Sequence, residues 1–151
     1  MKRARRRWKT TCRLYTHPAS VPIARVFAAA AARLAGFDSD AARDIQVAVA
    51  EAVGNAYLHA YGGGPEGQVE LDIDFDGAFL TIEIHDSGRP VAPGLSVPRE
   101  LPPPGRGGRG LYLIGRLMDT VEIHQPGRRG RGTLVVMKKR VPPAPHEPAR
   151  S

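Results

Sequence analysis

Residues 69–84 read Val-Glu-Leu-Asp-Ile-Asp-Phe-Asp-Gly-Ala-Phe-Leu-Thr-Ile-Glu-Ile, and this stretch decides the fold. Apolar residues alternate with charged or polar ones on both sides of Asp76-Gly77, a dipeptide that favours the type I′ hairpin turn. Because successive side chains of a strand point to opposite faces, the apolar residues of both strands share one face of a sheet. The stretch therefore predicts an antiparallel hairpin that is buried on one face and wet on the other.

A strand and a helix are predicted ahead of this hairpin. Residues 9–15 are expected to form an edge strand of the sheet. Ser20 is a candidate N-cap for the helix that follows, and Pro22 suits the first turn of that helix. Gly36 is expected to end it, because glycine readily adopts the left-handed conformation found after the last helical residue.

The second predicted helix is longer and amphipathic. It begins at a cap, Asp38 or Asp40, and runs to about Tyr61, where a glycine run stops it. At about 100° per residue, its apolar side chains form one face that we expect to pack on the sheet. The residues of this face are Ile45, Val49, Ala52, Val53, Ala56 and Ala60.

A polar stripe occupies a different face of the same helix. Glu51, Asn55 and His59 follow one another at a spacing of four residues, and small residues surround them. A carboxylate one turn from a carboxamide offers two kinds of oxygen ligand that suit Mg²⁺. The alternative interpretation is that these are ordinary solvated side chains on an exposed helix face.

The remaining elements follow a long aperiodic loop. Residues 86–108 hold six prolines, and a connection of this length within a small domain is either functional or disordered. A helix is predicted at 110–118, a strand at 120–124 and, after a turn rich in glycine and arginine, a final strand at 133–139. The order of elements predicts an α+β fold, a two-layer α/β sandwich with helices on one face of a mixed, mostly antiparallel sheet.

A glycine run, Gly-Arg-Gly-Gly-Arg-Gly at 105–110, leads directly into the third predicted helix. Glycines allow close approach of the backbone to a ligand, and a helix N-terminus attracts anions, so the run predicts a phosphate site to which Arg106 and Arg109 add charge. It is not a P-loop, since no Gly-Lys-Ser/Thr triplet occurs, and prolines rather than a buried strand precede it, which excludes a dinucleotide fingerprint. A flexible linker is the alternative.

The net charge of +7 is concentrated at the N-terminus. Six of the 22 basic residues lie in the first ten positions, and the rest of the chain has 16 basic and 15 acidic residues. This balance argues against direct nucleic-acid binding by the folded body. We expect a basic disordered arm at 1–9 and a Pro-rich disordered tail at 141–151. The single cysteine and the lack of a long apolar run favour a cytoplasmic protein without a membrane span.

Three motifs occur in one order along the chain. They are Glu-Ala-Val-Gly-Asn-Ala-Tyr-Leu-His-Ala-Tyr at 51–61, Asp-Ser-Gly at 86–88 and Gly-Gly-Arg-Gly-Leu-Tyr-Leu-Ile at 107–114, followed by Leu-Met-Asp at 117–119 and Gly-Thr at 132–133. Together they resemble the anti-sigma-factor serine/threonine kinases, which share the Bergerat ATP-binding fold with gyrase and the histidine kinases. The resemblance covers about residues 10–140 and implies one ATPase domain, with an ATP lid at about 91–107.

This resemblance implies ATP and Mg²⁺ as cofactors and a role for two residues of the polar stripe. Asn55 would bind the Mg²⁺ that bridges the phosphates, and Glu51 would orient and deprotonate the attacking hydroxyl. In phosphoryl transfer the protein mainly positions groups and neutralises charge, so one base, one metal and a backbone cradle suffice.

The resemblance also implies the residues that contact the nucleotide. Asp86 would accept the adenine amino proton, Gly88 would let the base approach, and Thr133 would lie near the adenine end. The nucleotide-binding residues of the glycine motif would be Gly108, Arg109, Gly110 and Leu111. The family's adenine motif continues Gly-x-Gly, whereas here Arg-Pro follow Gly88, a departure that bears on how tightly adenine binds.

Three functions compete at this point. The first is a protein serine/threonine kinase that sequesters a sigma factor and phosphorylates an anti-sigma antagonist, working as a homodimer; Arg25 would contact a partner, or is simply an exposed helix residue. The second is a catalytically inactive ATP-binding adaptor, which would have no need of Glu51. The third is a nucleic-acid-binding protein that acts through the basic arm.

Overall fold

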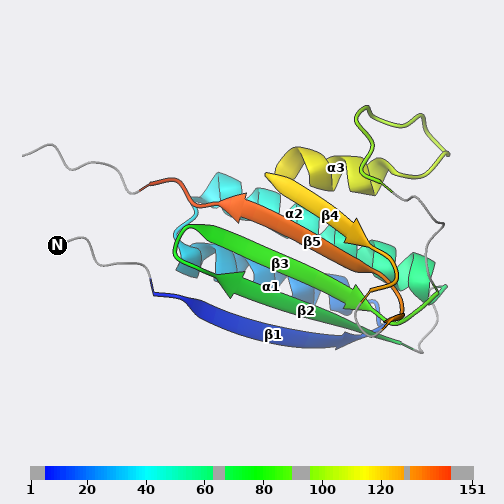
Figure 1. Cartoon of the computed structure of the whole chain (residues 1–151), viewed down its shortest axis with the longest axis horizontal. Coiled ribbons are helices and arrows are strands. Elements are labelled where there is room, and N and C mark those ends of the chain that lie inside the picture. The colour runs from blue at the N-terminus through cyan, green and yellow to red at the C-terminus, as the bar shows by residue number, and fades with distance from the viewer. Residues whose placement is uncertain (1–5, 63–66, 90–95, 128–129, 144–151) are drawn as a thin grey trace, which may run out of the picture.

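The computed structural model describes residues 6–62, 67–89, 96–127 and 130–143, which form a five-stranded sheet with helices over one face (Figure 1). The elements, in chain order, are β1 (Trp8–Tyr15), α1 (Ser20–Ala35), α2 (Ser39–Asn55), η1 (Ala56–Ala60), β2 (Gln68–Phe75), β3 (Phe79–Asp86), α3 (Arg109–Leu117), β4 (Thr120–His124) and β5 (Leu134–Arg140). The expected arm at 1–9 and tail at 141–151 fall largely outside the described residues, although β1 already begins at Trp8.

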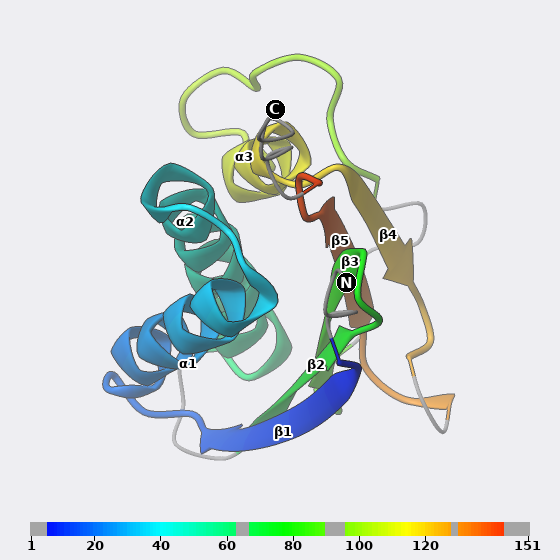
Figure 2. The ribbon, with the colours of Figure 1, turned by 90° about the vertical axis from the view of Figure 1, so that its left-hand side faces the viewer.

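The strands are arranged in the order β1-β2-β3-β5-β4, and all four neighbouring pairs are antiparallel. The predicted α+β sandwich is therefore confirmed, and the sheet is antiparallel at every described pairing. Figure 2 looks along the sheet and shows α1, α2 and α3 on one side of it, while no described helix covers the other face. Among the described residues, no helix is both long and apolar enough to cross a membrane.

The hairpin of β2 and β3 forms as predicted, with its apolar residues fully buried against the helices. The predicted position of its turn is wrong by one residue. Asp76 N donates to Phe79 O at 3.2 Å, so Gly77 and Ala78 form the tip. The reason is the Asp76 carboxylate, whose Oδ1 accepts from Ala78 N at 2.8 Å and from Phe79 N at 2.7 Å. Gly77 supplies the positive φ, 102°, that the tip requires.

The predicted cap of α1 is also wrong. Ser20 is the first helical residue, and its Oγ donates a hydrogen bond to the carbonyl of Tyr15, so this side chain fastens the helix to the end of β1. Ala19 occupies the N-cap position without a side-chain hydrogen bond. The predicted end of the helix is confirmed, since Gly36 has φ 99° and its N–H bonds back to Ala32 O and Arg33 O.

The second helix begins as predicted at Asp38, whose Oδ1 accepts from Ala41 N at 2.8 Å. Its six predicted core residues are all buried, at 7% exposure or less. After Asn55 the helix changes to a π-turn, η1, before it ends near Tyr61. Single π-turns inside a helix are rare and occur often at functional sites.

Candidate functional site

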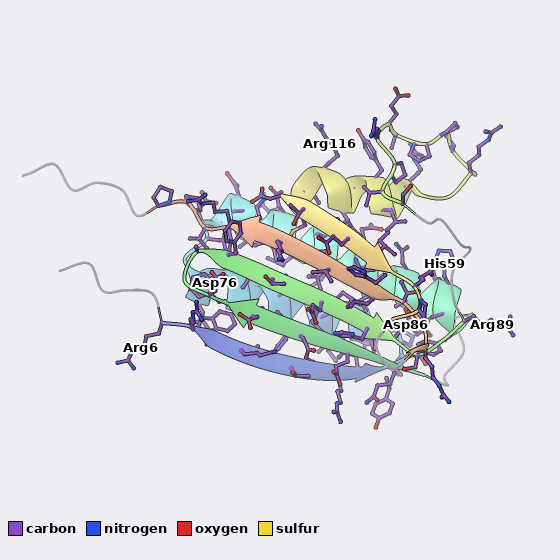
Figure 3. All side chains as sticks on the ribbon, viewed as in Figure 1. Arg6, His59, Asp76, Asp86, Arg89 and Arg116 are labelled. Atoms are coloured by element: carbon purple, nitrogen blue, oxygen red, sulfur yellow. The ribbon has the colours of Figure 1, made fainter. Side chains whose placement is uncertain are left out.

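A cavity of about 190 Å³ lies where η1, the start of α3 and the ends of β3 and β5 meet. Its wall combines small and apolar side chains with a few polar groups. The lining residues are Ala52, Asn55, Ala56, His59, Ala60, Ile84, Asp86, Gly107, Gly108, Gly110, Leu111, Ile114, Thr133 and Val135. His59 and Asp86 both appear at this end of the sheet in Figure 3. Such a cavity can take a flat, largely apolar ring that carries a few hydrogen-bonding groups.

Asp86 is held rigidly at one end of the cavity. Its Oδ1 accepts from Gly88 N at 3.1 Å and from Thr133 N at 3.3 Å, and its own N–H donates to Thr133 O at 3.1 Å. Within the described ranges its second oxygen, Oδ2, has no hydrogen-bond partner, so it can accept from a ligand. Burial raises the pKa of the Asp86 carboxyl above its usual range, although the two backbone N–H groups and nearby His85 oppose this.

Two glycines make room for this arrangement. Gly132 has φ 61°, and a Cβ there would collide with the backbone of Asp86. A Cβ at Gly88 would collide with the backbone of Ala60 at the end of η1. Gly132 is therefore required both for its positive φ and for its close contact, and Gly88 is required for its close contact.

Thr133 is 5% exposed and lies beside Asp86 in the cavity wall. Its Oγ1 accepts a hydrogen bond from Gln125 Nε2 at 2.9 Å, which leaves the hydroxyl proton available to a ligand. Gln125 is a supporting residue that no sequence pattern reveals. It follows β4 in a turn, where a single polar residue gives no pattern to recognise.

The polar stripe of α2 meets the first turn of α3 at the other end of the site. A Cβ at Gly110 would lie 2.7 Å from Glu51 Oε2 and 3.4 Å from both Nδ2 and Oδ1 of Asn55. Asn55 lines the cavity, and Glu51 stands one turn before it on the same helix. A carboxylate, an amide and a helix N-terminus therefore converge at one point.

The glycine run takes the backbone into the start of α3. Gly107 and Gly108 have φ of 72° and 81°, and Gly108 is the N-cap of α3 with no side-chain hydrogen bond. The first intrahelical bond runs from Tyr112 N to Gly108 O at 2.9 Å. The N–H groups before Tyr112 therefore have no acceptor within the helix, which is the arrangement that binds anions.

The structure brings most of the predicted site residues together. Those that line the one cavity are Asn55, Asp86, Gly108, Gly110, Leu111 and Thr133. Glu51 and Gly88 adjoin it through their contacts with Gly110 and Ala60. Arg109 is exposed at the start of α3, and Arg25 is exposed on α1, an element that contributes nothing to the cavity wall.

The apolar walls of the cavity are not recognisable in the sequence. Ile84, Ile114 and Val135 come from a strand, a helix and another strand, and each has the spacing of an ordinary core residue. Nothing in the periodicity separates a core position that faces a cavity from one that faces another side chain.

A second polar cluster lies on the uncovered face of the sheet. His85 Nε2 is 3.3 Å from Asp72 Oδ2 and 3.1 Å from Glu83 Oε2, and Thr11 Oγ1 donates to Asp72 Oδ1 at 2.6 Å. One ligand atom from each of the three residues lies within 4.8 Å of the others. The face of the sheet that was predicted to be wet is thus partly buried, since Asp72 is only 7% exposed. None of the residues of this cluster lines the cavity.

Comparison with known proteins identifies the family to which the chain belongs. The chain matches the family described as the histidine kinase-like ATPase domain over residues 14–139. It is 29% identical over 125 residues to the serine-protein kinase RsbW of Listeria innocua, which covers 77% of this chain and 79% of the relative. It is 33% identical over 115 residues to the serine-protein kinase RsbW of Oceanobacillus iheyensis, covering 71% and 73%.

The anti-sigma F factor of Bacillus cytotoxicus is also similar, at 33% identity over 87 residues, which covers 53% of this chain and 58% of that protein. The family match spans every described helix, strands β2, β3 and β4, β5 except Arg140, and the last two residues of β1, and it includes the whole cavity. The chain therefore belongs to the histidine kinase-like ATPases and, within them, to the family of anti-sigma-factor kinases.

Proposed function

We propose that this protein binds ATP with Mg²⁺, phosphorylates a serine or threonine of an anti-sigma antagonist and sequesters a sigma factor. The observation that carries the proposal is the pairing of two polar ends across one apolar cavity. Asp86 and Thr133 form one end, and Glu51 and Asn55 meet Gly110 at the other. The names of the relatives, serine-protein kinase and anti-sigma F factor, support the activity and the class of partner.

Adenine fits the end of the cavity that Asp86 forms. Asp86 Oδ2 is placed to accept from an exocyclic amino group, and the Thr133 hydroxyl can donate to a ring nitrogen. Ile114 and Val135 supply apolar contact for the ring. The cavity, at about 190 Å³, is smaller than the roughly 300–1,000 Å³ of sites that enclose a drug-sized ligand. It would therefore enclose the base and leave the phosphates at the mouth.

The triphosphate would lie along the backbone of Gly108 and Gly110, where glycine leaves the N–H groups accessible. Asn55 Oδ1 would hold Mg²⁺, for which an amide oxygen is a suitable ligand. ATP supplies the phosphoryl group. Within the chain, Glu51 would orient the hydroxyl of the protein substrate and accept its proton, a role that its position next to Asn55 and Gly110 permits.

Residues 91–107 are proposed as the ATP lid, of which 96–107 are described. Val97 packs against α3, since a Cβ at Gly115 would lie 2.5 Å from Val97 Cγ1. Pro98 and Pro102 approach Gly108, each with a ring carbon 3.5 Å from the place of a Cβ there. The described part of the lid thus already contacts the helix whose N-terminus would face the phosphates.

The proposed partners are a sigma factor, an antagonist protein and a second copy of this chain. Arg25 is exposed on α1, as a partner-contacting residue must be. The experiment that tests the activity compares wild type and Glu51→Gln for transfer of labelled phosphate from ATP to the antagonist that co-purifies with the protein. We expect Glu51→Gln to bind ATP normally and to transfer nothing.

Glu51→Gln is matched to Asn55→Ala, in which Mg·ATP binding should be weakened and transfer lost. Transfer at the wild-type rate by Glu51→Gln would refute the role of Glu51 as the base. Wild-type protein that binds ATP and its sigma factor but phosphorylates no antagonist would identify the second candidate, an inactive ATP-binding adaptor.

A further inference from the structure

From the last residue of β3 into the loop that follows, four consecutive backbone N–H groups each have an acceptor. These hydrogen bonds run from Asp86 N to Thr133 O (3.1 Å), from Ser87 N to Tyr61 Oη (2.9 Å), from Gly88 N to Asp86 Oδ1 (3.1 Å) and from Arg89 N to Ala60 O (3.1 Å). A loop that uses all of these donors has few alternative conformations. The conformation of the Asp86 side chain is fixed with it.

Two of the four acceptors belong to the end of the helical segment that carries Asn55. The π-turn brings Ala60 O to Arg89 N, and Gly88 packs directly on Ala60. Tyr61 then follows, and its hydroxyl reaches the backbone of Ser87. The amides on either side of Gly88 are therefore held by the end of this helical segment. Arg89 N bonds to the backbone of Ala60, whereas Ser87 N bonds to the side chain of Tyr61.

Tyr61 itself has a fixed position. Its hydroxyl donates to Gln68 O at 2.8 Å while it accepts from Ser87 N, so it links the start of β2 to the end of β3. Its ring lies against Gly67, where a Cβ would be 2.5 Å from the ring carbons. Gly67 also has φ 142°, a conformation that other residues rarely adopt. The side chain is thus seated on a glycine and bonded at its tip.

We infer that Tyr61 is a positioning residue for base recognition, which acts by holding Ser87 and thereby the orientation of the Asp86 carboxylate. This inference rests on the proposed function, in which Asp86 accepts from the adenine amino group. The Arg89 N–H is bonded to Ala60 O, so η1 and Tyr61 together hold the loop as far as Arg89.

The test is Tyr61→Phe in the full chain, with Tyr57→Phe as its matched control. The phenylalanine keeps the ring on Gly67 and removes only the hydroxyl. Tyr57 lies on η1 and makes no hydrogen bond to the loop in the part of the chain that is described. We expect the dissociation constants of ATP and ADP to rise by the same factor, about 3- to 10-fold, in Tyr61→Phe and to stay unchanged in Tyr57→Phe.

Two further readouts separate positioning from simple stabilisation. Hydrogen exchange of the Ser87 amide should accelerate in Tyr61→Phe, while that of the Asp86 amide, bonded to Thr133 O, should not. The preference for ATP over ITP should fall as the affinity for ATP falls, because ITP has no amino group for Asp86. A lower melting temperature with unchanged affinity and unchanged ATP/ITP preference would overturn the inference.

Gly67→Ala is a second, independent variant. It keeps the Tyr61 hydroxyl, but its Cβ would occupy the space in which the Tyr61 ring lies. It should also weaken ATP and ADP alike; unchanged binding would overturn the inference even if Tyr61→Phe failed to fold. The wild-type titration in the same series keeps the two claims apart. No ATP binding by wild type would refute the proposed function, whereas equal binding by wild type and Tyr61→Phe would refute only the role of Tyr61.

Discussion

Gly110 lies so close to Glu51 that a Cβ on the glycine would stand 2.7 Å from the carboxylate Oε2. The two residues belong to different helices, α3 and α2, and the same Cβ position is 3.4 Å from the amide atoms of Asn55. Any side chain at position 110 would therefore push apart the groups that we assign to the metal and the reacting hydroxyl. Glycine at this position lets the Glu51 carboxylate keep the place that it has in the site.

Replacing Gly110 by alanine should displace Glu51 and Asn55 and weaken Mg·ATP binding. Inserting a methyl group into a tight contact costs about 1–3 kcal/mol, so we expect a loss of affinity of roughly 5- to 150-fold. Isothermal titration calorimetry measures this directly. Gly54→Ala is the matched control, because it lies in α2 with nothing within 4 Å of its Cβ position and should keep full affinity. Gly110→Ala with wild-type affinity would show that the contact has no functional consequence.

Asp86→Asn should reverse the preference of the site from adenine to hypoxanthine. The two backbone N–H groups that bond Oδ1 should hold the carbonyl oxygen of the asparagine, so that its amide donor replaces Oδ2 in the cavity. A donor facing the adenine amino group is repulsive, whereas the carbonyl of hypoxanthine can accept from it. We expect ATP affinity to fall by about 10- to 100-fold and ITP to bind better than ATP.

The fold of Asp86→Asn should survive, since both hydrogen bonds to Oδ1 are kept, and a thermal melt checks this. A variant that still prefers ATP over ITP would contradict the assignment of Asp86 to the amino group.

On acidification, ATP binding should weaken at a higher pH than it would if Asp86 had the pKa of an ordinary aspartate. Burial raises the pKa of Asp86 in the folded protein, so its carboxylate is protonated while most exposed carboxylates are still ionised. The protonated form loses the acceptor for the amino group. Affinity for ATP measured against pH should fall through this raised pKa, and the fall should be absent in Asp86→Asn.

The raised pKa of Asp86 makes the stability of the fold depend on pH in the opposite direction from ATP binding. The folded state binds the Asp86 proton more tightly than the unfolded state, so this residue contributes stability below its unfolded pKa and loses that contribution as the pH rises through its folded pKa. Denaturant unfolding at neutral pH should therefore find Asp86→Asn as stable as wild type or more so. A variant that is less stable at neutral pH would contradict the cause given for the shift.

Local patterns in the sequence predict the fold and the ends of the site well. The alternation over residues 69–84 is sufficient for the hairpin and its buried face, because one period of two residues decides which side chains point inward. Glu51 and Asn55 are recognisable as a pair since one helical turn fixes their relation. The motif order then predicts that Asp86, Gly110 and Thr133 belong to the same site.

Contacts between distant segments are what the sequence does not reveal. Tyr61 bonds to Ser87, 26 residues away, through one hydroxyl, and Gln125 supports Thr133 in the same way; neither contact leaves a periodic signal. Ser20 has the right chemistry for an N-cap but is used to bond Tyr15 instead, because β1 ends beside it. Asp72 is buried on the face predicted to be wet, since Thr11 and His85 come from neighbouring strands.

The claim that this site binds ATP through Mg²⁺ held by Asn55 is tested by a calorimetric titration of ATP, with and without Mg²⁺, into wild type and Asn55→Ala. We expect wild type to bind ATP more tightly with Mg²⁺ than without it. Asn55→Ala should lose that difference, with Mg·ATP affinity lowered by about 10- to 100-fold while the protein stays folded. Equal Mg·ATP affinity in the two proteins, or no ATP binding by wild type, would contradict the account.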